Sequence, residues 1–135
     1  MKIFDCVRFF YYKYFFLNPY SRAEVMRKNK YFAKQGTGCY IAGDITITNP
    51  SLIELGDNVW ITTKCALLNH DFGLPDYTIK IGSNVRLGYG TIILKNVVLA
   101  KGITTGAGTI VTKSFSKENC VIVGNPAKIM VKKNR

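Results

Sequence analysis

The chain has 135 residues, enough for one domain whose core needs no disulfide or metal to hold it together. Its 19 Lys and Arg stand against 8 Asp and Glu, and the formal charge of +11 would attract phosphates, anionic lipid or nucleic acid alike. The four cysteines are too widely spaced for a C-x-x-C metal or redox motif, and we find no cleavable signal segment. We therefore expect reduced thiols in a cytoplasmic protein. The cysteines are Cys6, Cys39, Cys65 and Cys120.

The N-terminal segment, residues 1–38, is basic and rich in aromatic side chains, and we expect it to be helical. Ser21 and Glu24 form a capping box ahead of a helix that should run from about residue 22 to 34. The aromatic part is too short and too charged to span a bilayer. Two roles stay open. Residues 1–35 could make peripheral contact with an anionic membrane, or the segment could cap the following domain or contact a neighbouring subunit, which we favour.

The stretch from residue 79 to 111 reads IKIGSNVRLGYGTIILKNVVLAKGITTGAGTIV and repeats with a period of six. The first series of repeating positions is Ile81, Leu87, Ile93, Leu99, Thr105 and Val111. The second series, four residues after each, is Val85, Thr91, Val97, Ile103, Thr109 and Phe115. This period suits neither a helix nor an alternating strand. It predicts a parallel β-helix of short flat strands that turn at glycines.

The frame of this repeat sets the boundaries of the second domain. It continues backward to Leu55, then slips by two residues to Ile47 and Ile41, so we expect the coil to begin near residue 39. We assign the β-helix domain to residues 39–135. Its last part, from residue 112 onward, should serve as a short C-terminal cap, because an open solenoid end must be covered.

Four stretches carry a resemblance to a known family: IELGDNVWI, IKIGSNVRLGYGTIILKNV, GAGTIVTK and VIVGNPAKIM. Over residues 39–131 the chain resembles the hexapeptide-repeat acyltransferases, especially the sugar O-acetyltransferases and xenobiotic acetyltransferases. The resemblance implies an all-β solenoid, a left-handed parallel β-helix, with the N-terminal helices and C-terminal cap described above. A six-residue period by itself does not fix the handedness, so the left-handed sense comes from the family alone.

The repeat is interrupted by LNHDFGLPDYTIK, and we expect a loop over residues 70–80. This stretch contains the one histidine of the chain, His70. Loops on rigid scaffolds often carry function, and the family implied by the resemblance places its catalytic histidine just before such a loop. An imidazole, with an ordinary pKa of about 6.5, suits a general base near neutral pH. We predict His70 as this base, with Asp71 to orient it or the acceptor; Asp71 could equally belong to turn chemistry.

Two asparagines are candidates for binding the acceptor. Asn69 precedes His70, and Asn49 follows Thr48 one coil earlier, near where related enzymes keep a polar acceptor-binding residue. For Asn69 a purely structural role stays open.

The resemblance also implies a set of residues for acetyl-CoA. A backbone N–H at the corner formed by Gly88 and Tyr89 would stabilise the oxyanion of the tetrahedral intermediate. The pantetheine arm would lie along the GAGTIVTK stretch, and a lysine after the GNP turn would approach the phosphates. The residues implied for these cofactor contacts are Gly106, Ala107, Thr112, Lys113 and Lys128.

Together these features predict an acetyl-CoA-dependent O-acetyltransferase that acts on a saccharide or nucleotide-sugar hydroxyl, in cell-surface polysaccharide synthesis. The resemblance implies a homotrimer with active sites between subunits. We expect no metal and no nucleic-acid partner, and a cytoplasmic location in which contact with the inner face of the membrane stays open. The rival functions are an N-acetyltransferase of an amino-sugar nucleotide and a non-catalytic β-helical scaffold.

Overall fold

The computed structural model describes residues 32–70 and 74–131, which form three sheets, A, B and C, whose strands are parallel except for the last strand of sheet B. Sheet A contains β1 (Lys34–Gln35), β4 (Ile53–Leu55), β7 (Ile79–Ile81) and β10 (Val98–Leu99). Sheet B contains β2 (Tyr40–Ile41), β5 (Trp60–Ile61), β8 (Arg86–Leu87), β11 (Thr104–Thr105), β13 (Val121–Val123) and the antiparallel β14 (Lys128–Ile129). Sheet C contains β3 (Thr46–Ile47), β6 (Ala66–Leu68), β9 (Ile92–Leu94) and β12 (Ile110–Val111).

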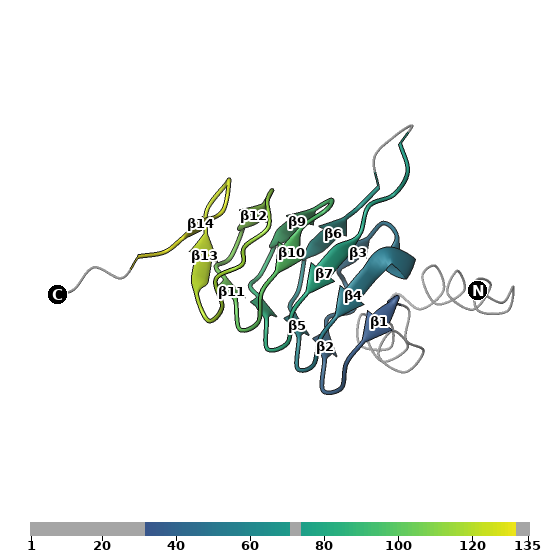
Figure 1. The fold of residues 1–135 in the computed structure, drawn as a ribbon, viewed down its shortest axis with the longest axis horizontal. Helices are drawn as coiled ribbons and strands as arrows, with labels where there is room; N and C mark the ends of the chain where they lie inside the picture. Colours follow the sequence, from purple (N-terminus) through teal and green to yellow (C-terminus); the bar gives the residue numbers. More distant parts are fainter. Residues whose placement is uncertain (1–31, 71–73, 132–135) are drawn as a thin grey trace, which may run out of the picture.

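The chain visits the sheets in the fixed order A, B, C and then returns to A, so each coil adds one strand to each sheet. The coils stack along the long axis, from β1 at the N-terminal end to β13 and β14 at the other (Figure 1). This is the parallel β-helix that the six-residue period predicts. The three sheets form the sides of a prism, and the chain turns a corner wherever it passes from one sheet to the next. The corners of successive coils stack on one another and form the edges of this prism.

The core is the column of side chains that points into the prism. All twelve positions of the two predicted series, from Ile81 to Phe115, are at most 7% exposed. The alternate residues of each strand point outward, because successive side chains of a strand face opposite ways. The register of the repeat is therefore confirmed at these twelve positions.

Truncation of one of these core side chains should destabilise the fold strongly. Ile93 in β9 is fully buried between β6 and β12, and we expect Ile93→Ala to lower the free energy of unfolding by about 2–5 kcal/mol, through lost burial and the cavity left behind. Chemical denaturation measures this change. The exposed Glu118 supplies the control, Glu118→Ala, which should change little. A loss below about 1 kcal/mol for Ile93→Ala would contradict the assigned core.

The N-terminal boundary of the β-helix differs from the prediction. The coil does not begin at residue 39, because β1 already pairs with β4 in sheet A, with Lys34 opposite Glu54. The helix predicted to run to residue 34 therefore cannot include Lys34, which lies in this strand. The rest of the predicted N-terminal helical segment lies outside the described residues.

The slip in the repeat between Ile47 and Leu55 has a local cause. A single 3₁₀ turn, η1 (Pro50–Leu52), is inserted between β3 and β4, and Asn49 caps it by accepting the Ser51 N–H at 3.1 Å. Proline in the first turn fits, since it has no N–H to leave unpaired there. The insertion that follows β6 covers residues 69–78, so it starts one residue earlier and ends two residues earlier than the predicted loop over 70–80, because residues 79 and 80 belong to β7.

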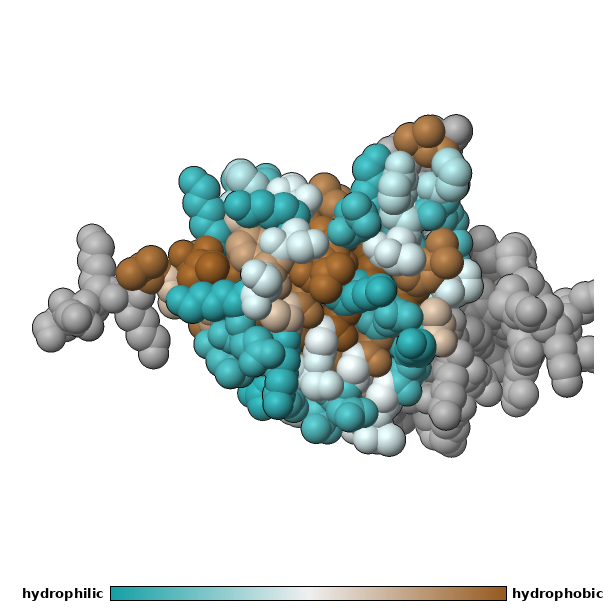
Figure 2. Space-filling model, in the orientation of Figure 1, coloured by the Kyte–Doolittle hydropathy of each residue, from teal (hydrophilic) through white to brown (hydrophobic). Residues whose placement is uncertain are grey.

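The three outer faces of the prism differ in chemistry. Sheet A is charged: Lys34 and Lys80 flank Glu54 at 3.6 and 3.8 Å. Sheet B carries aromatic side chains, with the rings of Tyr40 and Trp60 5.8 Å apart. The outward positions of sheet C are mostly aliphatic and half-buried: Ala66, Leu68, Ile92, Leu94 and Ile110. Figure 2 shows further apolar surface at the tip of the loop between β6 and β7 and at the chain end beyond β14.

Among the described residues no helix is long and apolar enough to cross a membrane.

Candidate active site

The candidate active site begins at the insertion, which leaves the prism at the edge where sheet C leads into sheet A. The loop between β6 and β7 projects from the stack of coils (Figure 1). A rigid coil lies on either side of its base, since β6 and β7 are both paired to strands of the coils before and after.

Asn69 fixes the base of this loop. Its side chain is fully buried, and its Oδ1 accepts the Thr48 hydroxyl at 2.8 Å and the Asn49 N–H at 3.0 Å. Its Nδ2 donates to the carbonyls of Asn49 and Tyr77 at 2.9 and 2.8 Å. Four partners satisfy the amide, so it has no capacity left for a saccharide. These contacts favour the structural role of Asn69 over the predicted acceptor-binding role. The Thr48 hydroxyl belongs to the same set of hydrogen bonds.

His70, next along the loop, is held by Asp76. The His70 Nδ1 lies 2.5 Å from the Asp76 Oδ1, and the Asn49 Nδ2 donates to the Asp76 Oδ2, also at 2.5 Å. The hydrogen bond from His70 and then the one from Asn49 lower the pKa of Asp76. An ionised carboxylate can only accept, so Nδ1 carries the hydrogen and Nε2 becomes the nitrogen that accepts a proton. The His70 side chain is 46% exposed, which leaves room for a reactant.

Asp76 is the site residue that the sequence reasoning missed. The predicted partner of His70 was Asp71, which lies outside the described residues. Asp76 is also an acid of the same insertion, six residues after the histidine, and it follows Pro75. Its spacing from His70 gives no signal in the sequence, because only the path of the loop brings the two side chains together. Asn49, predicted to bind the acceptor, donates its Nδ2 hydrogen to Asp76, and acceptor binding by Asn49 stays a prediction.

Thr112 and Lys113 lie on the same edge of the prism as His70, two coils further on. Both follow β12 and precede Phe115, which pairs with Leu99 of sheet A. Both side chains are exposed. Between them and the loop lies Lys95, whose Nζ stands 5.1 Å from the centre of the Tyr77 ring. A line of positive charge therefore runs along this edge from the histidine toward the C-terminal coils.

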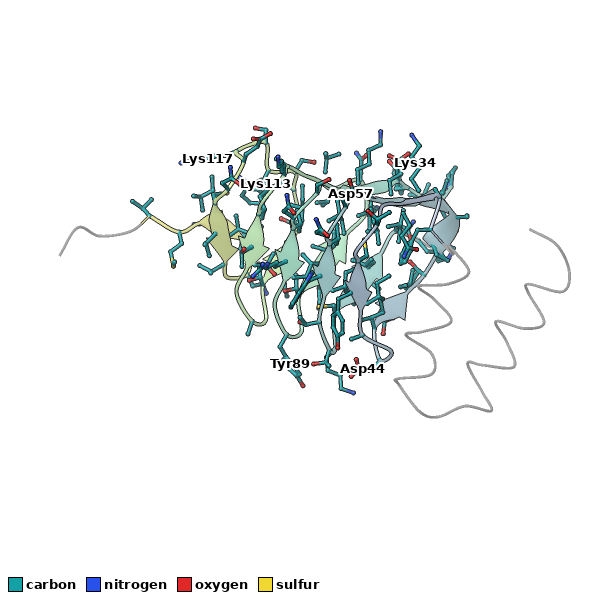
Figure 3. The ribbon with its side chains drawn as sticks, turned by 90° about the horizontal axis from the view of Figure 1, so that it is seen from below. Lys34, Asp44, Asp57, Tyr89, Lys113 and Lys117 are labelled. Carbon is teal, nitrogen blue, oxygen red and sulfur yellow. The ribbon has the colours of Figure 1, made fainter. Side chains whose placement is uncertain are left out.

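Four of the remaining cofactor candidates, Gly88, Tyr89, Gly106 and Ala107, lie at the edge between sheets B and C. Residues 88–91 and 106–109 form stacked turns, each closed by a hydrogen bond from a threonine N–H to a glycine carbonyl, at 3.1 and 3.3 Å. The Gly108 N–H donates to the Tyr89 carbonyl at 2.7 Å and joins the two turns. In Figure 3, Tyr89 and Asp44 mark this edge, on the opposite side of the prism from Lys113 and Lys34.

Gly88 is required where these turns stack. A Cβ at this position would lie 2.6 Å from the Thr105 carbonyl oxygen and 3.1 Å from the Ala107 nitrogen, both backbone atoms that cannot move aside cheaply. The turns of successive coils are thus in backbone contact. A Cβ at Gly106 would have one comparably close neighbour, the Val123 side chain at 2.8 Å.

Lys128 lies beyond the last complete coil. It is the first residue of β14, opposite Val123 of β13, and its side chain is exposed. It therefore adds positive charge at the C-terminal end of sheet B. Within one chain, the His70 group and the group of Tyr89, Ala107 and Lys128 are separated by the whole width of sheet C, so a single chain does not bring them together.

Three cysteines are described, and none is placed for catalysis. Cys39, Cys65 and Cys120 are buried and unpaired. Burial raises the pKa values of Cys39 and Cys65, which keeps both as neutral thiols. The described part of the chain also holds no group of three His, Cys, Asp or Glu side chains that could bind a metal ion.

Sequence comparison shows that the chain is similar to acetyltransferases. It is 31% identical over 129 residues to a galactoside O-acetyltransferase of Lactococcus lactis, a match that covers 88% of this chain and 60% of that protein. It is 37% identical over 106 residues to a Schizosaccharomyces pombe protein named as an acetyltransferase, covering 73% of this chain and 48% of the other. The chain thus spans about half of the length of these relatives. No family model matches the chain.

Comparison with solved structures gives the same fold. A hexapeptide-repeat-containing acetyltransferase of Vibrio cholerae superposes with a TM-score of 0.66 at 17% identity, over 94% of this chain and 88% of the other. An N-acyltransferase of Bacillus cereus, solved with an amino-sugar nucleotide and coenzyme A, superposes with a TM-score of 0.54 at 18% identity, over 83% and 90% of the two chains. These likenesses support the left-handed sense that the resemblance implied. The chain is thus similar in sequence to acetyltransferases, and its fold is that of a solved hexapeptide-repeat acetyltransferase.

Proposed function

We propose that this protein is an acetyl-CoA-dependent O-acetyltransferase that acts on a saccharide hydroxyl. The observation that carries the proposal is the hydrogen-bonded chain from Asn49 through Asp76 to the Nδ1 of His70. A carboxylate that fixes the tautomer and orientation of an imidazole is the arrangement a general base needs. The sugar O-acetyltransferase among the relatives supports the class of acceptor.

The reaction follows from the protonation states of these groups. The Nε2 of His70 accepts the proton of the acceptor hydroxyl while its oxygen attacks the carbonyl carbon of the acetyl thioester. A new C–O bond forms, and the carbonyl oxygen becomes an oxyanion. Collapse of this intermediate breaks the C–S bond, and the leaving CoA thiolate takes the proton back from His70. Asp76 stays ionised throughout and stabilises the imidazolium while it exists.

Acetyl-CoA would bind along the stacked turns between sheets B and C. The backbone of Tyr89 and Ala107 would face the thioester and the pantetheine arm, and Gly106 would let the arm approach closely. The exposed Lys113 and Lys128 supply positive charge for the phosphates. Coenzyme A in the structure of the fold neighbour from Bacillus cereus supports the choice of donor.

The His70 group and the stacked turns at Tyr89 and Ala107 come together if the protein is a trimer packed through sheet C. Sheet C lies between the edge of His70 and the edge of Tyr89, and its outward face is aliphatic. Outward apolar surface of this kind favours association. Packing sheet C around a three-fold axis would set His70 of one subunit against the Tyr89 and Ala107 turns of the next.

The trimer proposal predicts the effect of a charge on sheet C. Ile92 points outward from the middle of this sheet, and Ile92→Lys should dissociate the assembly, because a buried lysine without a partner is costly at an interface. Multi-angle light scattering measures the mass. Val98→Lys, on the 46% exposed Val98 of sheet A, is the matched control and should leave the mass unchanged. Dissociation by the control alone would contradict the proposed interface.

The first test of the function is a transfer assay. The protein is incubated with acetyl-CoA and a panel of galactosides, maltose and a nucleotide-linked amino sugar, and the products are identified by mass spectrometry. Acetylation of a hydroxyl supports the proposal. Acetylation of the amine alone would replace it with the N-acetyltransferase alternative, and the absence of acetyl-CoA binding at millimolar concentration would leave a β-helical scaffold.

A further inference from the structure

We propose that the buried hydroxyls of Thr105 and Thr91 are positioning groups that aim the Tyr89 N–H out of the prism, toward the oxyanion of the acyl transfer. The inference rests on the proposed function, which it deepens by naming what holds the donor. It comes from a local break in the β-ladder of sheet B, next to the turn at Gly88.

The break lies at a single backbone N–H. At this edge the residue after each sheet B strand donates to the next coil's backbone: the Thr62 N–H bonds the Leu87 carbonyl at 3.3 Å, and the Gly106 N–H bonds the Ile122 carbonyl at 3.0 Å. At the equivalent place the Gly88 N–H donates instead to the side-chain Oγ1 of Thr105, at 2.9 Å. The Thr105 side chain thus takes the place of the backbone carbonyl that accepts the equivalent N–H in the other coils.

The hydrogens at this break can be assigned because each hydroxyl has only one. The Thr91 hydroxyl donates to the Gly88 carbonyl at 2.8 Å. Thr91 Oγ1 and Thr105 Oγ1 are 2.6 Å apart, so the Thr105 hydroxyl must be the donor between them. The result is a closed ring: Gly88 N–H to Thr105, Thr105 to Thr91, and Thr91 back to the Gly88 carbonyl. Both polar groups of one glycine are clamped by two buried side chains.

The clamp also orients the next peptide bond. The Gly88 carbonyl points into the prism, where it accepts the Thr91 N–H at 3.1 Å and the Cys65 thiol at 3.2 Å in addition to the Thr91 hydroxyl. In a planar trans peptide the N–H points opposite to the C=O. The Tyr89 N–H must therefore point outward, on a residue that is 59% exposed.

The identity of Thr105 argues for a specific role. In the repeat it occupies a position that holds an aliphatic residue at Ile81, Leu87, Ile93 and Leu99. A buried hydroxyl is costly unless it is hydrogen-bonded, so a valine of the same shape would serve packing alone equally well. The next turn has no such ring, because the Gly106 N–H keeps its backbone partner. The ring is therefore confined to the turn that carries the proposed oxyanion donor.

The test compares Thr105→Val with Thr105→Ser and a packing control. Ile103→Val removes one buried methylene-sized group from the same coil and leaves the ring intact. Amide NMR follows the Gly88 N–H in each variant, and steady-state kinetics with an acceptor from the panel separates kcat from the KM for acetyl-CoA. A melting curve for each variant confirms folding.

We expect Thr105→Val to move the Gly88 amide proton upfield and to lower kcat by about 10-fold or more, with the KM for acetyl-CoA within about twofold of wild type. Thr105→Ser should restore both, and Ile103→Val should change neither. An unchanged kcat in a folded Thr105→Val protein whose Gly88 signal has moved would overturn the inference. Absence of acetyl transfer by the wild type would instead overturn the proposed function, and with it the catalytic use of the ring.

Discussion

His70→Ala should abolish nearly all turnover and leave the β-helix folded. We expect kcat to fall by about 10²–10⁴-fold, the usual contribution of a positioned general base. The fold should survive because the side chain is 46% exposed on a loop outside the core. Release of the CoA thiol, followed with a thiol reagent, measures the rate, and the melting temperature reports the fold.

Two further measurements make this result specific to the imidazole. Acetyl-CoA affinity, measured by calorimetry, should change little, since the proposed role of the imidazole is to accept the proton of the acceptor hydroxyl and not to hold the cofactor. Leu74→Ala, at a 51% exposed position of the same loop, controls for general disturbance of the loop. If His70→Ala retained a quarter of the wild-type kcat, His70 would not be the base.

Asp76→Asn should have the second largest effect, a loss in kcat of about 10²-fold. The amide keeps the shape of the carboxylate but loses its charge, so it neither stabilises the imidazolium nor requires the hydrogen of His70 to sit on Nδ1. The hydrogen bond from Asn49 also loses its charged acceptor. Asp57→Asn makes the same chemical change at a distant corner, where Asp57 accepts the Thr37 N–H at 2.9 Å, and should leave kcat unchanged. Equal rates for wild type and Asp76→Asn would show that His70 needs no carboxylate partner.

The lowered pKa of Asp76 adds a pH signature to this variant. A carboxyl group whose pKa is lower in the folded than in the unfolded state stabilises the fold above the unfolded value, and this contribution disappears as the pH falls through the folded value. Below about pH 4, the stability of the wild type should therefore fall more steeply than that of Asp76→Asn. Unfolding curves at a series of acidic pH values measure both slopes. Parallel slopes would contradict the hydrogen bonds assigned to Asp76.

The fold could be predicted from the sequence because the repeat encodes it locally. Each coil reuses one pattern, so inward positions such as Ile81 and Leu87 could be identified by spacing alone. The residues that form the corners were harder to predict. Asn58, Asn84 and Asn96 adopt positive φ values between 53° and 63°, a role that the sequence reasoning gave to glycine. The start of the β-helix at β1 could not be predicted, because a strand of two residues is too short to show the six-residue repeat.

The site could be predicted only in part, because it depends on contacts across coils and within a loop. His70 was predicted as the base from its position before the break in the repeat, and this role stays a proposal. Asp76 was not, since only the fold of the loop places it against the imidazole. Asn69 was assigned to the acceptor because sequence does not tell a buried, satisfied amide from an exposed one. Thr105 was predicted only as an inward position of the repeat, and it is the geometry at Gly88 that points to the positioning role we propose for it.

The most direct test of the central claim is the transfer of labelled acetyl groups from acetyl-CoA to the saccharide panel by the wild type and His70→Ala proteins. We predict label on a saccharide hydroxyl with the wild type, and a rate reduced at least about 100-fold with His70→Ala. Equal labelling by both proteins, or no labelled saccharide with either, would contradict the proposed O-acetyltransferase.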